Sequence, residues 1–281
     1  MIKSVAYFPL QTAQNSKPAL AAILASLQRN GITVVQDSMD ADAVIIWSVL
    51  WAGRMSKNKS VYEHYRAQGK PVIVVDIGAL HRGDTWKVAV NNINADGYYG
   101  HTENLDWDRP RKLKISLSMN FSSNPSILIA AQHRNSLQVA NISSIEDWVL
   151  KQIKKLRTVT DRPIVVRSHP RCQLNWSTIG THATVDRPAK IQESYDSFDM
   201  HFDYHAVVNL NSGPGIQSAI AGTRPLVDST SLAYPVGIQL NQLEDPYLAD
   251  RDKWLVEICH TEYTVNELSE GIWLERLKTA L

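Results

Sequence analysis

The sequence contains little cysteine, little net charge and no long apolar run, and each of these shortages excludes a class of protein. Cys172 and Cys259 are the only cysteines among 281 residues, so we expect two unpaired thiols in a reducing compartment rather than a disulfide framework or metal cluster. The 29 lysines and arginines nearly equal the 28 acidic residues, so no net field would draw the chain to nucleic acid or a membrane. No apolar run reaches the roughly 18 residues of a membrane-spanning helix, and the N-terminus has no signal-peptide pattern. We expect a soluble, cytoplasmic protein without a membrane partner.

Glycine and proline are also too scarce, at 13 and 12 residues, for a collagen-like or low-complexity chain. With 44% hydrophobic and 20% charged residues, the composition is that of an ordinary globular protein. The length suits two domains of about 100 to 150 residues or one large α/β unit.

Short apolar segments alternate with helical patterns in the first half of the chain. We expect helices that begin near Pro18 and Val61, and the predicted strands are residues 4–10, 33–35, 43–47 and 71–75. Continuous β-branched runs are typical of strands buried on both faces, so this alternation predicts a parallel sheet. Residues 76–100 contain four glycines and little periodicity, and we expect them to form a functional loop at the carboxyl edge of the sheet.

A basic segment at 109–114 interrupts this pattern, and a second α/β series follows it. Its predicted strands are 126–130, 163–167, 206–210 and 225–227, with a helix at 216–221. Capping boxes are predicted ahead of two amphipathic helices, at Ser143 with Glu146 and at Thr264 with Glu267. The sequence therefore predicts an α/β protein of two Rossmann-like domains facing a central cleft, 1–118 and 119–281, the second including the C-terminal helix.

The most informative motif begins where the strand at 206–210 ends. A turn of small residues leads into a helix, whose unpaired backbone N–H groups would form an anion site. A tight βαβ connection without a ligand is the alternative, because short glycine motifs are weakly specific. The residues of this turn and helix start are Ser212, Gly213, Gly215, Ile216, Gln217 and Ser218.

Basic side chains follow the predicted strand at 163–166. Arg167, His169 and Arg171 fall within five residues, at the same expected edge of the sheet as the glycine turn. Guanidinium groups make bidentate contacts with phosphates, and a histidine can donate to a phosphate oxygen. We expect these groups to form one anion site, with a structural role as the alternative for each.

The strand-HPR element followed by N-S-G-x-G-x-Q-x-x-x-x-G-x-x-P resembles the donor-binding domain of GT-B glycosyltransferases. It is similar to capsule-polysaccharide-like transferases and to short transferases of this build from tailed phages. In the first half, the strand that ends in Asp76 and Gly78, followed by Arg82 and Trp86, is similar to the phage type. One departure is Gln217, which stands where GT-B enzymes often place a glutamate that holds the ribose.

The resemblance implies a GT-B-like fold in which residues 119–281 bind a nucleotide sugar, first of all a UDP-sugar, as the donor substrate. No permanently bound cofactor is implied. The diphosphate would be held by Arg167, His169 and Arg171 and by the N–H groups of the glycine turn, with Gln217 or Ser218 near the ribose. The loop after 126–130 would line the donor pocket through Gln132, His133 and Arg134, although exposed loop charges are the alternative for the last two. No metal is expected, because the Asp40-Ala41-Asp42 pair precedes its strand and so points away from the site.

Inverting sugar transfer needs a base that takes the proton of the acceptor hydroxyl. Asp76 is the best candidate, because it is a carboxylate at the carboxyl end of a buried strand. Capping of the Gly78 turn is the structural alternative for this aspartate. His81 and Asp84 lie in the same predicted loop and are the substitutes.

The acceptor candidates lie in residues 47–59, which contain three cations, two tryptophans and no acid. Cations follow phosphates and aromatic rings support an extruded base, although a solvated basic loop is the alternative. The proposed contacts are Trp51, Arg54, Lys57 and Lys59, and the segment 109–114 would add a second positive stretch.

The favoured prediction from these features is sugar transfer to 5-hydroxymethylpyrimidine, for example 5-hydroxymethylcytosine, in DNA, by a bacteriophage enzyme in the host cytoplasm. A polysaccharide or other glycan acceptor is the alternative within the enzyme class. A non-catalytic nucleotide- or nucleic-acid-binding protein on the same fold and a sugar-nucleotide hydrolase or epimerase also remain open. No protein partner is indicated.

Overall fold

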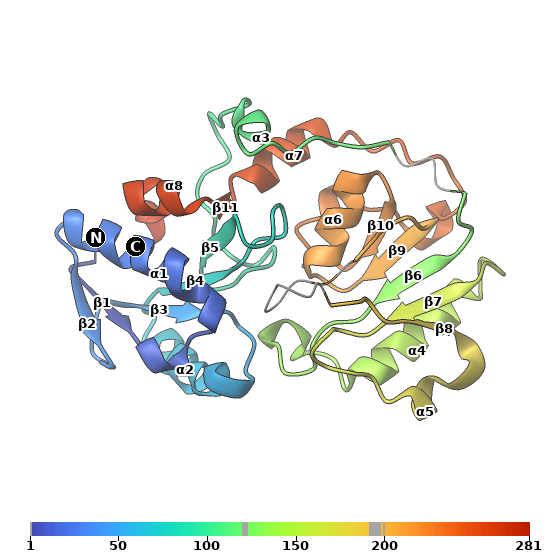
Figure 1. Cartoon of the computed structure of the whole chain (residues 1–281), viewed down its shortest axis with the longest axis horizontal. Helices are drawn as coiled ribbons and strands as arrows, with labels where there is room; N and C mark the ends of the chain where they lie inside the picture. The colour runs from blue at the N-terminus through green and yellow to red at the C-terminus, as the bar shows by residue number, and fades with distance from the viewer. Residues whose placement is uncertain (1, 120–122, 191–197, 199) are drawn as a thin grey trace. The chain divides into compact units, whose positions relative to one another are not determined.

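The structure is a computed structural model that describes residues 2–119, 123–190, 198 and 200–281. The chain forms two compact units: Met1–Arg109 with Val256–Leu281 is unit 1, and Pro110–Leu255 is unit 2. Each unit contains a sheet that is largely or wholly parallel, with helices packed against it (Figure 1). The predicted α/β class is confirmed. Within the described residues, no helix is long and apolar enough to cross a membrane.

The sheet of unit 1 has six strands in the order β11-β5-β4-β3-β1-β2. The parallel strands are β1 (Ser4–Tyr7), β2 (Thr33–Gln36), β3 (Ala43–Trp47) and β4 (Val72–Ile77). All five residues of β3 are buried, as its continuous apolar run predicts. Helices α1 (Lys17–Arg29) and α2 (Asn58–Ala67) follow β1 and β3, which confirms the predicted alternation.

One expectation for unit 1 is wrong, because residues 76–100 are not all loop. Strand β5 (Trp86–Val90) lies within them, antiparallel to β4, and Asp76 is paired with Lys87 across the two strands. All five residues of β5 are buried, although one of them is a lysine. The strand is hard to predict from the sequence because glycines flank it and the lysine interrupts its apolar run.

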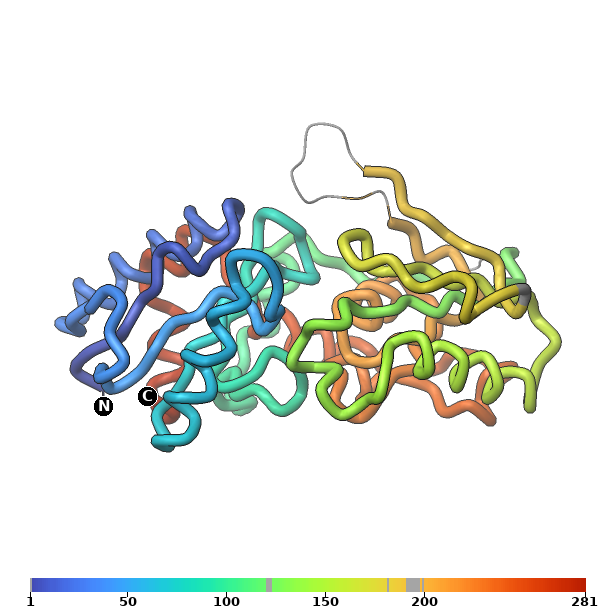
Figure 2. Tube along the Cα trace, turned by 90° about the horizontal axis from the view of Figure 1, so that it is seen from below, coloured from blue at the N-terminus to red at the C-terminus, as the bar shows by residue number. Residues whose placement is uncertain are grey.

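The C-terminal segment belongs to unit 1, whereas the sequence-based expectation placed it in the second domain. Strand β11 (Glu262–Tyr263) is antiparallel to β5, and helices α8 (Val265–Glu270) and α9 (Ile272–Leu277) follow it. Trp273 is fully buried, and its indole donates to Ser26 Oγ of α1 at 3.0 Å. The backbone N–H of Ile2 donates to Leu281, so the two ends of the chain lie close together (Figure 2). The predicted capping box of Thr264 and Glu267 is confirmed.

The sheet of unit 2 is fully parallel, with five strands in the order β10-β9-β6-β7-β8. Its strands are β6 (Ile127–Ala130), β7 (Ile164–Arg167), β8 (Thr184–Asp186), β9 (Ala206–Asn209) and β10 (Arg224–Val227). Its helices are α4 (Ile145–Leu156), α5 (Trp176–Ile179) and α6 (Gly213–Ala221). Two further helices, α3 (Arg109–Lys112) and α7 (Asp252–Cys259), contain the points where the chain passes between the units.

The N-terminus of α4 differs from the predicted capping box by one residue. Ser144, not Ser143, is the N-cap, and its hydroxyl accepts the N–H of Asp147 at 3.0 Å. Glu146 does not cap the helix, because its carboxylate accepts from the Arg134 side chain and from the N–H of Asn175.

In both sheets, the direction in which the chain adds strands reverses at one point. In unit 2 the chain runs outward from β6 to β7 and β8, and then continues on the other side of β6 with β9 and β10. In unit 1 the reversal lies between strands β1 and β3. Ligands of open α/β sheets bind at the carboxyl ends of strands beside such a switch point.

Candidate active site

In unit 2, the loops that follow β6 and β9 are clamped together by two amide side chains. Gln132 Nε2 donates to Asn211 Oδ1 at 3.0 Å, and Gln132 Oε1 accepts the backbone N–H of Asn211 at 2.8 Å. Both side chains are buried. Gln132, a predicted donor-site residue, therefore lies at the switch point, where it fixes the loop ahead of α6.

His133 links this pair of loops to the loop that follows β7. Its ring lies 5.2 Å from the ring of His169, in an edge-to-face arrangement. His133 Nδ1 accepts the N–H of Asn135, and His169 Nδ1 accepts the N–H of Arg171, both at 3.1 Å. In the neutral form each ring therefore carries its proton on Nε2, and that of His133 can donate to a ligand.

The charge of His133 is set by its surroundings. Burial lowers the pKa of this histidine, and the guanidinium groups of Arg171 and Arg134 lower it further. At neutral pH the ring is therefore uncharged, and an anion bound beside it would raise its pKa.

Helix α6 begins with backbone N–H groups that no side chain caps. Its N-cap residue, Ser212, makes its side-chain bond to Asn209 instead, and Asn209 also donates to the carbonyl of Ala130 at 2.9 Å. A Cβ atom on Gly215 would lie only 2.9 Å from Val227 Cγ1, so the close approach of the helix to β10 requires glycine there. The turn predicted from Asn209 to the helix is confirmed, and its N–H groups lie at the carboxyl end of β9.

Arg167 is placed differently from the expected phosphate ligand. Its side chain is 3% exposed, Nε donates to Asp186 Oδ2 at 2.6 Å, and Nη2 donates to the His201 carbonyl at 3.0 Å. Only Nη1 lacks a hydrogen-bond partner within the part of the chain that the structure describes. Arg167 and Asp186 face each other across β7 and β8, and this geometry favours the structural alternative for the arginine.

Other predicted donor residues also have local roles. Ser218 is fully buried and donates to the carbonyl of Gly215, and Ile216 is 2% exposed, so neither side chain reaches the turn. The expectation that Ser218 lies near a ribose is therefore not supported, whereas Gln217 on the same helix is half-buried. Arg134 bridges Glu146 and the carbonyl of Gln173 on the surface.

In unit 1, Asp76 lies near the carboxyl end of β4 and is partly buried. Its Oδ2 accepts the Ser48 hydroxyl at 2.9 Å and its Oδ1 accepts the N–H of Ile77 at 2.7 Å. Burial raises the pKa of Asp76, while these bonds and the charges of Lys87 and Arg82 oppose the rise. A carboxyl group with a raised pKa is a better proton acceptor, as the predicted base requires.

Ser48 was not predicted from the sequence. It directly follows β3, is 6% exposed, and has a left-handed φ of 59°, which is strained for a residue other than glycine. Its N–H donates to the Val75 carbonyl, and its hydroxyl accepts the N–H of Leu50 while donating to Asp76. Such conformations collect at functional sites, where surrounding contacts hold them.

Glu262 was also not predicted, and it holds the turn that follows β4. It is fully buried, and its carboxylate accepts the N–H groups of Ala79 at 2.7 Å and Leu80 at 3.1 Å. The Thr85 hydroxyl donates to the same carboxylate at 2.7 Å. A Cβ atom on Gly78 would collide with Glu262 and Thr85, so this position requires glycine. Glu262 therefore caps the Gly78 turn, which is the structural role expected as the alternative for Asp76.

The substitute bases lie in the turn between β4 and β5. The N–H of Asp84 donates to the carbonyl of His81 at 3.1 Å, and the Asp84 side chain is exposed. His81 is half-buried. Asp40 and Asp42 lie elsewhere, since Asp42 accepts backbone N–H groups at the beginning of β1, away from the carboxyl edge.

The predicted acceptor cations remain on the surface of unit 1. Arg54 and Lys57 are exposed on the short 3₁₀ helix Gly53–Lys57, which follows β3. Lys59 pairs with Glu63 at 3.8 Å on α2, a contact between two exposed side chains.

The aromatic residue of this segment packs locally. The Trp51 ring lies 5.7 Å from that of Tyr62 and is half-buried. Asn58, which is buried, donates to the carbonyls of Gln11 and Trp47, so the loop after β3 is fixed to the loop after β1. The segment therefore lies at the switch point of this sheet.

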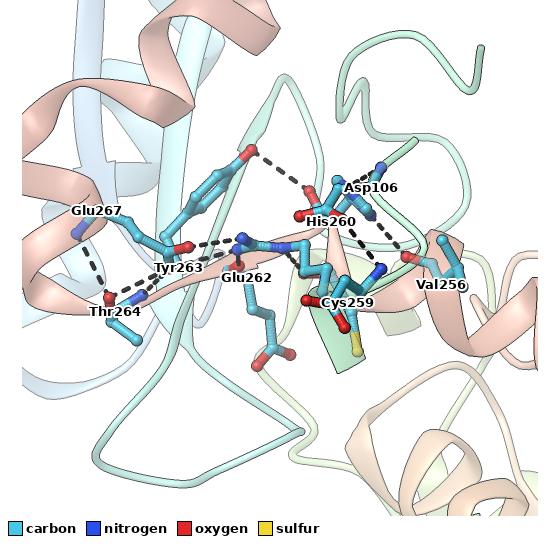
Figure 3. A network of polar contacts seen from close by, with 10 residues as sticks. Asp106, Val256, Cys259, His260, Glu262, Tyr263, Thr264 and Glu267 are labelled. Atoms are coloured by element: carbon cyan, nitrogen blue, oxygen red, sulfur yellow. Dashed lines mark hydrogen bonds and ion pairs between the residues drawn. The ribbon is translucent and has the colours of Figure 1, made fainter. Parts of the chain in front are cut away.

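Arg109 does not add to the second positive stretch that was expected at 109–114. It is 6% exposed, and its guanidinium donates to Glu267 Oε1 and to the carbonyls of Glu262 and Cys259, each at 2.6 Å. The Glu262 side chain points away from this network (Figure 3). Arg109 is therefore occupied within unit 1, where it ties the end of the first segment to the returning C-terminal segment.

Comparison with known proteins gives a structural likeness only. No family model matches the chain, and neither does any curated protein. Among solved structures, the chain is similar to Thermosulfurimonas dismutans KpsC, beta Kdo 2,4 transferase, with a TM-score of 0.53 and 13% identity over 96% of this chain and 98% of that one. It is equally similar to the beta Kdo 2,7 transferase KpsC of the same organism, with a TM-score of 0.53 and 12% identity over 97% and 99%. At this level of identity the likeness shows a shared fold, which in this chain consists of two units with parallel-rich sheets.

Proposed function

We propose that this protein is a GT-B-type glycosyltransferase that transfers a sugar from a nucleotide sugar to a hydroxyl group of a glycan. The observation that carries the proposal is the cluster at the carboxyl edge of the unit 2 sheet. There, His133 lies 5.2 Å from His169, and Gln132 of the same loop is bonded to Asn211, just ahead of the uncapped N-terminus of α6. Neutral hydrogen-bond donors beside a helix N-terminus suit a diphosphate.

In this proposal, unit 2 binds the leaving group. The Nε2–H groups of His133 and His169 and the first N–H groups of α6 donate to phosphate oxygens as negative charge develops on them. Arg171 is exposed, and its charge acts on His133, so it can add a cation from the rim. Arg167 holds β7 against β8 and acts on the site only through the position of the following loop.

Unit 1 supplies the proton acceptor. Asp76 takes the proton of the acceptor hydroxyl while Ser48 and the N–H of Ile77 hold its two oxygens in place. Direct attack of that hydroxyl on the sugar would invert the anomeric centre. His81 and Asp84, in the turn after β4, remain the substitutes for this role.

The names of the structural neighbours support the choice of acceptor class. Both are named for transfer of the sugar Kdo, and neither name includes a nucleic acid. Their names support the glycan acceptor over 5-hydroxymethylpyrimidine in DNA. Nucleotide-linked Kdo therefore joins the UDP-sugars as a donor to test.

The experiment is a transfer assay that offers both acceptor classes. The protein is incubated with nucleotide-linked Kdo and a panel of UDP-sugars, together with an oligosaccharide array or with 5-hydroxymethylcytosine DNA. The expected result is a mass gain on a glycan that is lost in Asp76→Asn but kept in Lys151→Met, a control on the exposed face of α4. A mass gain on DNA alone, or no donor binding at all, would contradict the proposal.

A further inference from the structure

Lys87 is a buried cation whose charge acts on the neighbouring carboxylate of Asp76. It lies on β5, is 7% exposed, and its ammonium makes no hydrogen bond or ion pair with any described residue. A buried ammonium without a hydrogen-bond acceptor is costly, so proteins rarely keep one that has no role. The position of Lys87 therefore calls for a ligand.

The two nearest acids have their oxygens occupied. Asp76 on β4 and Glu262 on β11 both stand opposite Lys87 in the sheet, and opposite residues of antiparallel strands point to the same face. Asp76 accepts bonds from Ser48 and Ile77, and Glu262 accepts three from the turn after β4. The lysine thus lies between two carboxylates that are directed toward other donors.

A second donor lies beside this row. The Tyr99 hydroxyl is buried and has no hydrogen-bond partner among the described residues. Burial and the nearby charges of Glu262 and Asp76 raise the pKa of Tyr99 well above its usual range, so the phenol stays protonated. The hydroxyl is therefore available as a hydrogen-bond donor to an anion.

We propose that Lys87 and Tyr99 form a subsite beside Asp76 that binds a carboxylate or phosphate group of the sugar substrate. The inference rests on the proposed function for its substrate, since it places an acidic sugar next to the candidate base. An ammonium is a compact charge that recognises such anions, and a phenol adds a directional bond. The anionic group can belong to the transferred sugar or to the acceptor glycan, because both meet at the base during transfer.

The test is a binding measurement that does not depend on turnover. Saturation-transfer NMR on the full chain compares free glucuronic acid and free Kdo with glucose as the neutral probe. We expect the acidic sugars to bind in preference to glucose, and Lys87→Met to weaken them about tenfold to a hundredfold, the range for one charge-assisted hydrogen bond. Tyr99→Phe should weaken them less, because it removes a neutral donor.

Two controls separate binding from folding. Lys87→Met should unfold cooperatively, as the wild type does, so that a loss of sugar binding is not a loss of folding. Lys70→Met, which changes a lysine ahead of β4 at the other end of the sheet, should leave sugar binding unchanged. Equal binding of acidic and neutral sugars, absence of acidic-sugar binding, or full binding in Lys87→Met would overturn the subsite.

The source of the anion is decided in two further arms. If it belongs to the donor, Lys87→Met weakens binding of UDP-glucuronic acid and not of UDP-glucose. If it belongs to the acceptor, the variant weakens a uronic-acid-terminated oligosaccharide and not its neutral counterpart. Acid-specific binding that requires Lys87 but comes without any transfer would sustain the subsite and refute the proposed function. Transfer that is abolished in Asp76→Asn but intact in Lys87→Met would support the proposed function and refute the subsite.

Discussion

The two units contain the same kind of sheet edge but different chemistry. In unit 2 the switch point gathers neutral and positive donors, namely His133, His169 and the N-terminus of α6. In unit 1 the corresponding edge carries two acids, Asp76 and Glu262, with Lys87 between them. The comparison teaches that a shared architecture leaves the chemistry to a few loop and strand-end residues. The proposed function assigns diphosphate binding to those of unit 2 and proton transfer to those of unit 1.

The two edges also differ in how they are held. In unit 2, the clamp of Gln132 and Asn211 joins loops whose strands are direct neighbours. In unit 1, the turn after β4 depends on Glu262, a residue that lies 183 positions further along the chain from Ala79. The turn beside the unit 1 site therefore depends on the pairing of the C-terminal segment with the sheet.

The largest expected effect is on the base in unit 1. Asp76→Asn should lower the transfer rate about a hundredfold or more, because an amide cannot accept the hydroxyl proton. Donor affinity, assigned to unit 2, should stay unchanged. Rates and donor binding of the same preparation check this, and an active Asp76→Asn enzyme would move the base to His81 or Asp84.

The pH dependence of stability gives an independent view of Asp76. Because its folded pKa is raised, the folded protein holds this proton more tightly than the unfolded chain, so stability is lost as pH rises from the usual aspartate pKa through the folded value. Asp76→Asn should remove that loss and be at least as stable as the wild type at neutral pH. Denaturant unfolding of both proteins between pH 4 and pH 8, as rough limits around these pKa values, measures the difference.

Glu262 tests whether the returning segment supports the unit 1 site. Glu262→Ala should destabilise the protein by about 2 to 3 kcal/mol, because it leaves the buried N–H groups of Ala79 and Leu80 and the Thr85 hydroxyl without their acceptor. Glu270→Ala, an exposed acid of the same segment, is the matched control. Chemical denaturation gives both free energies of unfolding. Equal stability of the two variants would show that Glu262 does not stabilise the turn after β4.

A smaller effect is expected in unit 2. His133→Ala should weaken donor binding about tenfold, because it removes one hydrogen bond to the diphosphate. In the wild type, binding should tighten as pH falls below about 6.5, since the bound anion favours the charged histidine. Calorimetry over this pH range checks both points. His201→Ala, which changes an exposed histidine of unit 2, is the control and should bind the donor as the wild type does. If His133→Ala binds the donor with unchanged affinity and the same pH response, His133 does not contact the diphosphate.

The smallest effect is expected away from both sites. Arg162 lowers the pKa of Glu244 to about 2, so this pair stabilises unit 2 above the usual glutamate pKa and loses its contribution as pH falls toward 2. Both side chains are partly exposed, at 29% and 48%, so Glu244→Gln should cost at most about 1 kcal/mol at neutral pH. Unfolding at pH 7 and pH 3 checks this, and a larger loss that persists at the lower pH would contradict it.

Much of the fold follows from local sequence signals. Continuous apolar runs predict β3 and β4. The turn of small residues predicts the helix α6, although the helix begins at Gly213 and not at the expected residue 216. Strand β5 escapes prediction because a lysine interrupts its apolar run and both of its faces are covered. The placement of the C-terminal helices escapes it because their burial against α1 depends on contacts across the whole chain.

The candidate site shows the same division. Asp76, His133 and His169 follow from their positions at strand ends, and the structure places the two histidines side by side. The burial of Arg167 could not be predicted, because its partner Asp186 lies on β8, a strand of three residues without a clear pattern.

The most direct measurement of the central claim is donor titration by calorimetry into three proteins: the wild type, Asp76→Asn and His169→Ala. Nucleotide-linked Kdo and the UDP-sugars serve as ligands, and single-turnover transfer is measured on the same samples. The division between the units predicts that Asp76→Asn binds the donor as the wild type does but does not transfer, and that His169→Ala binds it about tenfold more weakly. Unchanged donor affinity in His169→Ala, or lost donor affinity in Asp76→Asn, would contradict it.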